Sequence, residues 1–174
     1  GIIYKERFNV LRIAAKRLKE QARADFEEFC KTEEDWLSDY ALFMALKDSF
    51  SGRAWSLWPE ELKRRDENAL NKAGEELSED IYFWKSTQYL FYKQWFSLKK
   101  AAKERGISLI GDMPIYVSED SSDVWTHPEL FQMDEELRPL RVAGCPPDGF
   151  SESGQLWGNP LFNWKRMKER GYDW

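Results

Sequence analysis

The periodicity of apolar residues changes abruptly at Gly106. Before this glycine, from Tyr4 to Arg105, apolar residues recur at the three-to-four spacing of amphipathic helices. After it, residues 107–117 form a short apolar run of the kind that buried strands show. A helix that is closed by glycine and followed by such a run is typical of α/β architecture. The sequence therefore predicts an α/β fold, with helices over 1–105 and, over 106–174, a strand followed by loops and a short helix.

The helical part divides into recognisable segments. An amphipathic stripe runs from Phe8 to Leu18, and Trp36–Leu46 has apolar residues on more than one face, which predicts a buried helix. Thr32, followed three residues later by Asp35, resembles a capping box and predicts where that buried helix starts. The strongest pattern covers Ile81–Arg105. In the second part, we expect short helical pieces at 123–125 and 164–170.

Composition and charge exclude several classes of protein. The 174 residues carry 26 Lys and Arg against 31 Asp and Glu, a net charge of −5, so a concentrated basic face for nucleic acid is not expected. No apolar run approaches the roughly 20 residues that a membrane helix needs. Cys30 and Cys145 lie far apart without disulfide spacing, which favours free thiols and a reducing compartment. We therefore expect a cytoplasmic protein that binds neither nucleic acid nor membrane.

Metal and nucleophile chemistry find no support in the sequence. The chain has one histidine, His127, and no clustered Cys or His at metal-ligand spacing. His127 precedes Pro128 without a nucleophile elbow nearby, and there is no glycine-rich phosphate loop. We predict no metal site and no cofactor.

The last third instead gathers groups that bind sugars. Carboxylates and amides bind paired hydroxyls, while aromatic faces pack on the C–H surfaces of pyranose rings, and the chain has nine Trp. The candidates are Asp112, Glu119, Asp120, Asp123, Trp125, Asp148, Phe150, Gln155, Trp157 and Asn159.

Each candidate also has a purely structural interpretation. We favour that interpretation for Asp120 as a cap, for Trp125 as core, and for Asp148 as a turn-capping residue between Pro147 and a glycine. For Asp112 the functional and the structural interpretation are equally favoured. A carboxylate after an apolar run is unfavourable to bury unless it forms hydrogen bonds or takes part in function.

Three motifs carry a specific resemblance. They read GDMPIYV at 111–117, VAGCPPD at 142–148 and GQLWGNPL at 154–161, and a helical FYKQW precedes them at 91–95. In this order and spacing they resemble the 4-α-glucanotransferases, or amylomaltases, of glycoside hydrolase family 77. The resemblance covers the chain as an internal fragment of such an enzyme.

The resemblance implies a (β/α)8 TIM barrel with a predominantly helical inserted subdomain, of which this segment is mostly α with short strands. It implies transfer of a 1,4-α-D-glucan segment to an acceptor glucan or glucose by a retaining double displacement. The partners would be α-1,4-glucans, or maltooligosaccharides, and the remainder of the parent enzyme.

The resemblance also assigns residues. Asp112 matches a motif aspartate at the donor sugar, and Asp148 belongs to a loop that folds over the cleft. The substrate-binding set that follows is Asp112, Asp148, Phe150, Gln155, Trp157 and Asn159. Gly149 stands where some relatives place Tyr and others a small residue, so the resemblance leaves the acceptor or cyclisation preference of the loop open.

The family's nucleophilic Asp, acid/base Glu and third Asp follow later than Trp174. No catalytic residue is therefore expected in this chain, and the chain alone is expected to be inactive. Two other hypotheses remain open: a non-catalytic α-glucan-binding module, and a helical interaction scaffold whose aromatic residues are all core.

Overall fold

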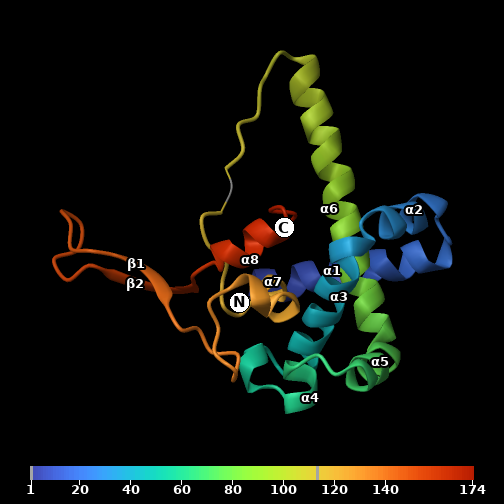
Figure 1. The fold of residues 1–174 in the computed structure, drawn as a ribbon. Helices are drawn as coiled ribbons and strands as arrows, with labels where there is room; N and C mark the ends of the chain where they lie inside the picture. The colour runs from blue at the N-terminus through green and yellow to red at the C-terminus, as the bar shows by residue number, and fades with distance from the viewer. Residues whose placement is uncertain (1, 113) are drawn as a thin grey trace. The chain divides into compact units, whose positions relative to one another are not determined.

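The computed structural model describes residues 2–112 and 114–174. These residues form two compact units (Figure 1). Unit 1 comprises residues 1–51 and 68–112, and unit 2 comprises residues 52–67 and 113–174. The chain therefore leaves unit 1 at Ser51, contributes a short segment to unit 2 and returns to unit 1 before crossing finally.

Unit 1 is helical throughout its regular structure. Its elements are α1 (Ile2–Glu20), α2 (Ala24–Thr32), α3 (Glu34–Ser49), α5 (Glu67–Glu76) and α6 (Ser78–Glu104). The helices predicted from the apolar stripes at Phe8–Leu18, Trp36–Leu46 and Ile81–Arg105 are confirmed. Gly106 has φ +71°, a left-handed conformation that glycine adopts without Cβ strain, and it ends α6 as expected.

The core of unit 1 lies along the first half of α6. Phe83 and Trp84 of α6 pack against Ala15 of α1 and against Ala41 and Ala45 of α3. The two aromatic side chains are 3% and 6% exposed, so their burial contributes about 1.5–3 kcal/mol each. The small alanines let the helices approach closely, and Figure 1 shows α1, α2 and α3 gathered around this part of α6.

A second cluster joins α2 to α6. Phe26 packs edge-on against Tyr89, with ring centroids 5.5 Å apart. The Tyr89 hydroxyl donates a hydrogen bond to Asp25 Oδ2 (2.6 Å), and Arg23 Nε donates to Asp25 Oδ1 (2.7 Å). The hydrogen bond from Arg23 contributes most to lowering the pKa of Asp25, and the bond from Tyr89 adds to it, so this pKa lies well below its usual range.

The predicted capping box is wrong. Thr32 is the last residue of α2, and α3 begins at Glu34 with Glu33 as N-cap and no side-chain cap hydrogen bond. Helix α2 instead continues almost directly into α3, because the Glu33 N–H still bonds back to Phe29 O (3.0 Å). The buried character of the second helix is confirmed, since Leu37 and Ala41 are fully buried.

The second half of α6 and the segment after it expose apolar side chains. Phe91, Phe96 and Leu98 are each 57% exposed, and Ile110 is 97% exposed. The expected buried strand over 107–117 is not present: residues 107–112 and 114–117 hold no strand. A strand requires hydrogen bonds to a neighbouring strand, and none of the described residues supplies one to this run.

Unit 2 consists of short elements. They are η1 (Trp55–Leu57), α4 (Glu60–Lys63), α7 (Ser122–Thr126), η2 (Pro128–Leu130), β1 (Val142–Cys145), β2 (Gln155–Pro160) and α8 (Trp164–Glu169). The helical pieces expected near 123–125 and 164–170 are confirmed as α7 and α8. Strands β1 and β2 pair in antiparallel fashion as one two-stranded ribbon, drawn in orange to red in Figure 1.

The core of unit 2 is built around two tryptophans. Trp125 is 1% exposed, packs edge-on against Trp58 at 5.6 Å, and donates from Nε1 to Leu62 O (3.0 Å). Trp58 and Leu62 belong to the segment that interrupts unit 1. The structural interpretation of Trp125 as a core residue is therefore confirmed. None of the described helices is long and apolar enough to cross a membrane.

Candidate functional site

The β1–β2 hairpin carries most of the predicted sugar-binding residues. Its register pairs Gly144 with Leu156 and Cys145 with Gln155, and an irregularity interrupts the register between Val142 and Gly144. Gly144 is required because a Cβ at this position would collide with the backbone oxygen of Gln155. Such irregularities twist a ribbon and re-aim the side chains beyond them. The hairpin can therefore hold residues 155–159 in a fixed direction.

The loop between the two strands is organised by Asp148. Its Oδ1 accepts hydrogen bonds from the backbone N–H groups of Phe150 (2.8 Å) and Ser151 (2.9 Å), and the Asp148 N–H donates to Ser151 O (3.0 Å). This is the turn-capping arrangement that the structural interpretation expects. Gly154 closes the loop at φ +74°, where a Cβ would lie 2.6 Å from Cys145 O.

Aromatic and amide groups on this hairpin are open to solvent. Phe150 is 98% exposed at the turn that Asp148 forms, and Trp157 is 50% exposed on β2. Trp157 Nε1 donates to Gln155 Oε1 (3.0 Å), so each side chain restricts the rotation of the other. An exposed indole held by an amide is a suitable surface for the apolar face of a sugar ring.

Asn159 connects β2 to the segment after residue 113. Its Nδ2 donates to the backbone oxygen of Val117 at 2.7 Å, and the side chain is only half-exposed. This amide therefore has a positioning contact in addition to any contact with substrate.

Asp112 lies in the other unit. It is the last residue of unit 1 and its side chain is exposed, whereas the other five predicted residues belong to unit 2. The structure brings Asp148, Phe150, Gln155, Trp157 and Asn159 together on one hairpin and its loop.

Beside Trp157, unit 2 contains a hollow of about 280 Å³. It is lined by Ala54, Trp55, Ser56, Ser118, Glu119, Asp120, Trp157, Gly158 and Asn159. Trp55, 1% exposed, fixes its floor: the backbone N–H donates to Asp120 Oδ1 (3.2 Å) and Nε1 donates to Glu119 O (2.7 Å). Two segments more than 60 residues apart are thereby joined.

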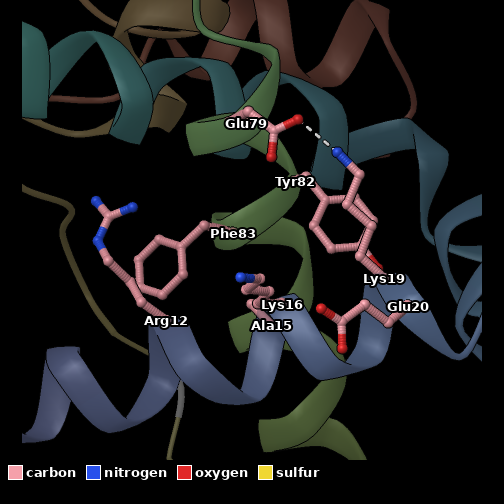
Figure 2. Close-up of a pocket in the computed structure, with 8 residues that line it drawn as sticks. All are labelled: Arg12, Ala15, Lys16, Lys19, Glu20, Glu79, Tyr82 and Phe83. Atoms are coloured by element: carbon pink, nitrogen blue, oxygen red, sulfur yellow. Dashed lines mark hydrogen bonds and ion pairs between the residues drawn. The ribbon is translucent and has the colours of Figure 1, made fainter.

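Unit 1 has its own hollow between α1 and α6 (Figure 2). The Arg12 guanidinium lies over the Phe83 ring at 4.3 Å, and Lys19 Nζ lies 5.3 Å from the Tyr82 ring centre while it pairs with Glu79. Because cations cover both rings, neither ring offers a free face to a sugar. This hollow is not the candidate site.

A larger cavity of about 860 Å³ in unit 2 is lined mainly by aromatic and aliphatic groups, among them Tyr116, Phe162 and Trp174. Tyr116 and Phe162 stack on each other, with ring planes 18° apart. Its lining carboxylate, Asp173, is paired with Arg170 (2.9 Å). Its other polar side chains include Tyr116, Gln132 and Tyr172. The described residues contain no group of three or more His, Cys, Asp or Glu that could hold a metal ion.

Comparison with known proteins decides the family. The family model described as 4-alpha-glucanotransferase matches residues 1–174. The chain belongs to the 4-alpha-glucanotransferase family. The resemblance drawn from the three motifs is thus confirmed.

Curated 4-alpha-glucanotransferases show the extent of this similarity. The enzyme from Clostridium butyricum is 44% identical over 175 residues, covering 100% of this chain and 36% of that protein. The enzyme from Thermus thermophilus is 48% identical over 176 residues, covering 99% of this chain and 35% of that protein. The chain therefore spans about a third of the length of these 4-alpha-glucanotransferases.

Solved structures agree. An amylomaltase from Streptococcus agalactiae in complex with acarbose has a TM-score of 0.93 and 47% identity, covering 98% of this chain and 35% of that one. An amylomaltase from Corynebacterium glutamicum, at 24% identity and a TM-score of 0.68, shares the fold. This chain is a mostly helical segment with two short strands that matches part of an amylomaltase.

Sequence reasoning missed the residues around Trp55. In the sequence, Asp120 has a structural interpretation as a cap, and Ser56 gives no signal because it lies 62 positions before Ser118 in the chain. The Trp-Ser pair at 55–56 precedes a helix start and looks like ordinary loop sequence. A sequence taken alone has no means of showing that this loop meets residues 118–120.

Proposed function

We propose that this chain supplies part of the substrate cleft of a 4-α-glucanotransferase. The reaction transfers a segment of a 1,4-α-D-glucan to an acceptor glucan or to glucose with retention of configuration. The whole enzyme would be a (β/α)8 barrel that carries the helical unit 1 as an insertion. The observation that carries this proposal is the family match over the whole chain, together with the hairpin that presents Trp157 and Gln155 to solvent.

We assign the binding of glucan to six residues, listed here: Asp112, Asp148, Phe150, Gln155, Trp157 and Asn159. On the hairpin, Phe150 and Trp157 offer exposed rings for the C–H faces of glucosyl units. Asp148 preorganises the turn that carries Phe150, which reduces the ordering cost of closing the loop over a glucan. Asp112 would contact the donor sugar from its exposed position.

The 174-residue chain alone would not catalyse transfer. The double displacement needs one carboxylate as nucleophile and a second as general acid and base, flanking the scissile bond. In the hairpin loop, Asp148 already accepts two backbone hydrogen bonds, and Asp120 holds the Trp55 N–H. We therefore assign the reacting carboxylates to segments of the full-length enzyme outside these residues. We also propose a cytoplasmic location for that enzyme, because free thiols such as Cys30 and Cys145 suit a reducing compartment.

The alternative from another class is a non-catalytic α-glucan-binding module. The exposed Phe150 and Trp157 rings would serve such a module equally well. The two functions differ in turnover, which the next experiment measures. A helical scaffold without ligands is disfavoured because these rings are not part of a core.

The experiment is a disproportionation assay on maltotriose that follows glucose release. It compares the 174-residue chain with a full-length protein that contains it. We expect glucose release only from the full-length protein, and a large loss of kcat/KM in its Asp112→Ala variant. Activity in the short chain would refute the assignment of the carboxylates, and activity in neither protein would favour the binding module.

A further inference from the structure

The indole of Trp157 lies against a second aromatic ring. Its centroid is 6.3 Å from that of Tyr116, and the two ring planes meet at 56°. This tilted geometry lies within the range of roughly 4.5–7 Å that aromatic pairs favour. Trp157 belongs to β2, whereas Tyr116 lies on the segment after residue 113, so the contact joins two distant segments of unit 2.

Tyr116 is held on its other side by Phe162. The two rings stack with centroids 6.1 Å apart and planes at 18°. The residue after Tyr116, Val117, accepts a hydrogen bond at its backbone oxygen from Asn159 Nδ2 (2.7 Å). A half-buried side chain that is packed on a ring and bonded through its backbone neighbour has lost most of its rotamer freedom. Tyr116 is therefore placed before any ligand binds.

Phe162 gives this row of rings a rigid end. It is 6% exposed, packs on Phe131 at 5.4 Å, and forms an antiparallel backbone bridge with the same residue. Gln132 Nε2 also donates to Phe162 O (3.1 Å). A close-packed core resists displacement, so Phe162 supports Tyr116, and Tyr116 supports Trp157 in turn.

Trp157 needs such support because half of its side chain faces solvent. Its hydrogen bond to Gln155 orients the indole, but Gln155 is itself exposed on β2. An exposed amide exchanges this bond with water at little cost, so the bond does not anchor the ring to the core. Among the described residues, the ring contact with Tyr116 supplies that anchor.

We propose that Tyr116 is a positioning residue of the candidate site, which backs the Trp157 ring and fixes the direction in which that ring faces solvent. The benefit to glucan binding rests on the proposed function, whereas the orientation of Trp157 does not. An indole that is already immobile offers its face without the cost of ordering it during binding. The support comes from the Tyr116 ring, so phenylalanine can replace tyrosine here.

The first test measures the mobility of Trp157 in the full-length protein that contains this chain. The protein is labelled with 5-fluorotryptophan, and the ¹⁹F signal of Trp157 is assigned by its loss in Trp157→Phe. We expect the transverse relaxation rate of this signal to fall in Tyr116→Leu, because the released indole rotates freely. Tyr116→Phe should retain the wild-type rate.

The matched control is Tyr172→Leu. Tyr172 is 60% exposed and lines the same cavity as Tyr116. Its replacement removes a tyrosine ring from unit 2 and should leave the relaxation rate of Trp157 at the wild-type value.

The second test is a double-mutant cycle in transferase kinetics on maltotriose. Tyr116→Leu should raise KM about fivefold, since the indole must then be ordered during binding. In the Trp157→Leu background, Tyr116→Leu should raise KM no further, because the two residues act as a unit. A Tyr116 that only stabilised the fold would lower the amount of active enzyme to the same extent in both backgrounds.

An unchanged or higher relaxation rate of Trp157 in Tyr116→Leu refutes the positioning role, and so does an equal rise of KM in both backgrounds. If circular dichroism shows that Tyr116→Leu does not fold, Tyr116→Met enters the same comparisons, since its flexible side chain fills the space without a ring. A wild-type protein without transferase activity would remove the proposed function, while the ¹⁹F signal would still decide whether Tyr116 positions Trp157.

Discussion

Replacing Trp55 by Phe should destabilise unit 2 by about 2–3 kcal/mol. Trp55 is 1% exposed and its Nε1 donates to Glu119 O at 2.7 Å. The variant loses that hydrogen bond and leaves the Glu119 carbonyl oxygen without its donor, which together cost about 1.5–2 kcal/mol. The smaller ring also leaves a void, which adds roughly 0.5–1 kcal/mol.

The assay is urea unfolding of the 174-residue chain, followed by near-ultraviolet circular dichroism. At an m-value of about 2 kcal/mol/M, the expected loss lowers the midpoint of the unit 2 transition by about 1–1.5 M. Trp164→Phe is the matched control, because Trp164 is 63% exposed and should change the free energy of unfolding by less than about 0.5 kcal/mol. Equal, small effects of the two substitutions would refute the argument that Trp55 joins the two segments.

Three further predictions concern the hairpin and unit 1. In the full-length protein, Asp148→Asn should retain most of the transferase kcat/KM, because the Asn side-chain oxygen still accepts the hydrogen bonds from the loop N–H groups. Asp148→Ala should lower kcat/KM about tenfold, because those bonds are lost. Equal losses in the two variants would mean that the negative charge of Asp148 acts on the substrate directly. Gly144→Ala should displace β2, because the added Cβ would collide with the Gln155 backbone oxygen, and should weaken maltotriose binding to the chain. Gly74→Ala has open space around it in α5 and should raise helix stability by about 0.5–1 kcal/mol. Unchanged binding in Gly144→Ala would contradict the close contact between Gly144 and Gln155. Because the pKa of Asp25 is depressed in the fold, its stabilisation is fully present above its unfolded pKa of about 3.9 and is lost progressively as pH falls from there through its folded pKa. Asp25→Asn should therefore lower the Tm at pH 7 and lower it by less near pH 2; a Tm difference that is the same at both values would refute this sign.

Several features follow from local sequence alone. The stripe from Phe8 to Leu18 and the long pattern of Ile81–Arg105 produce α1 and α6, because helical periodicity places apolar groups on one face whatever the partner is. Gly106 ends α6 through a local backbone preference. The motif spacing from residue 111 to 161 was sufficient to identify the family.

Other features were decided by contacts between distant residues. The run 107–117 has strand-like composition but forms no strand, because pairing depends on a neighbour that composition does not specify. Thr32 and Asp35 match a capping pattern, yet Thr32 is the last residue of α2 and no side-chain cap forms at the start of α3. The Glu33 N–H bonds back to Phe29 O of α2 instead.

The candidate site shows the same division. The resemblance of the motifs predicts Asp148, Phe150, Gln155, Trp157 and Asn159 as substrate-binding residues, and this assignment stays a prediction. The direction in which Trp157 is held depends on Gln155, and the pocket beside it depends on Trp55 meeting residues 119–120 across more than 60 positions. Local propensity determines helices and turns within a few residues, whereas a binding pocket is defined by side chains that only long-range packing brings together.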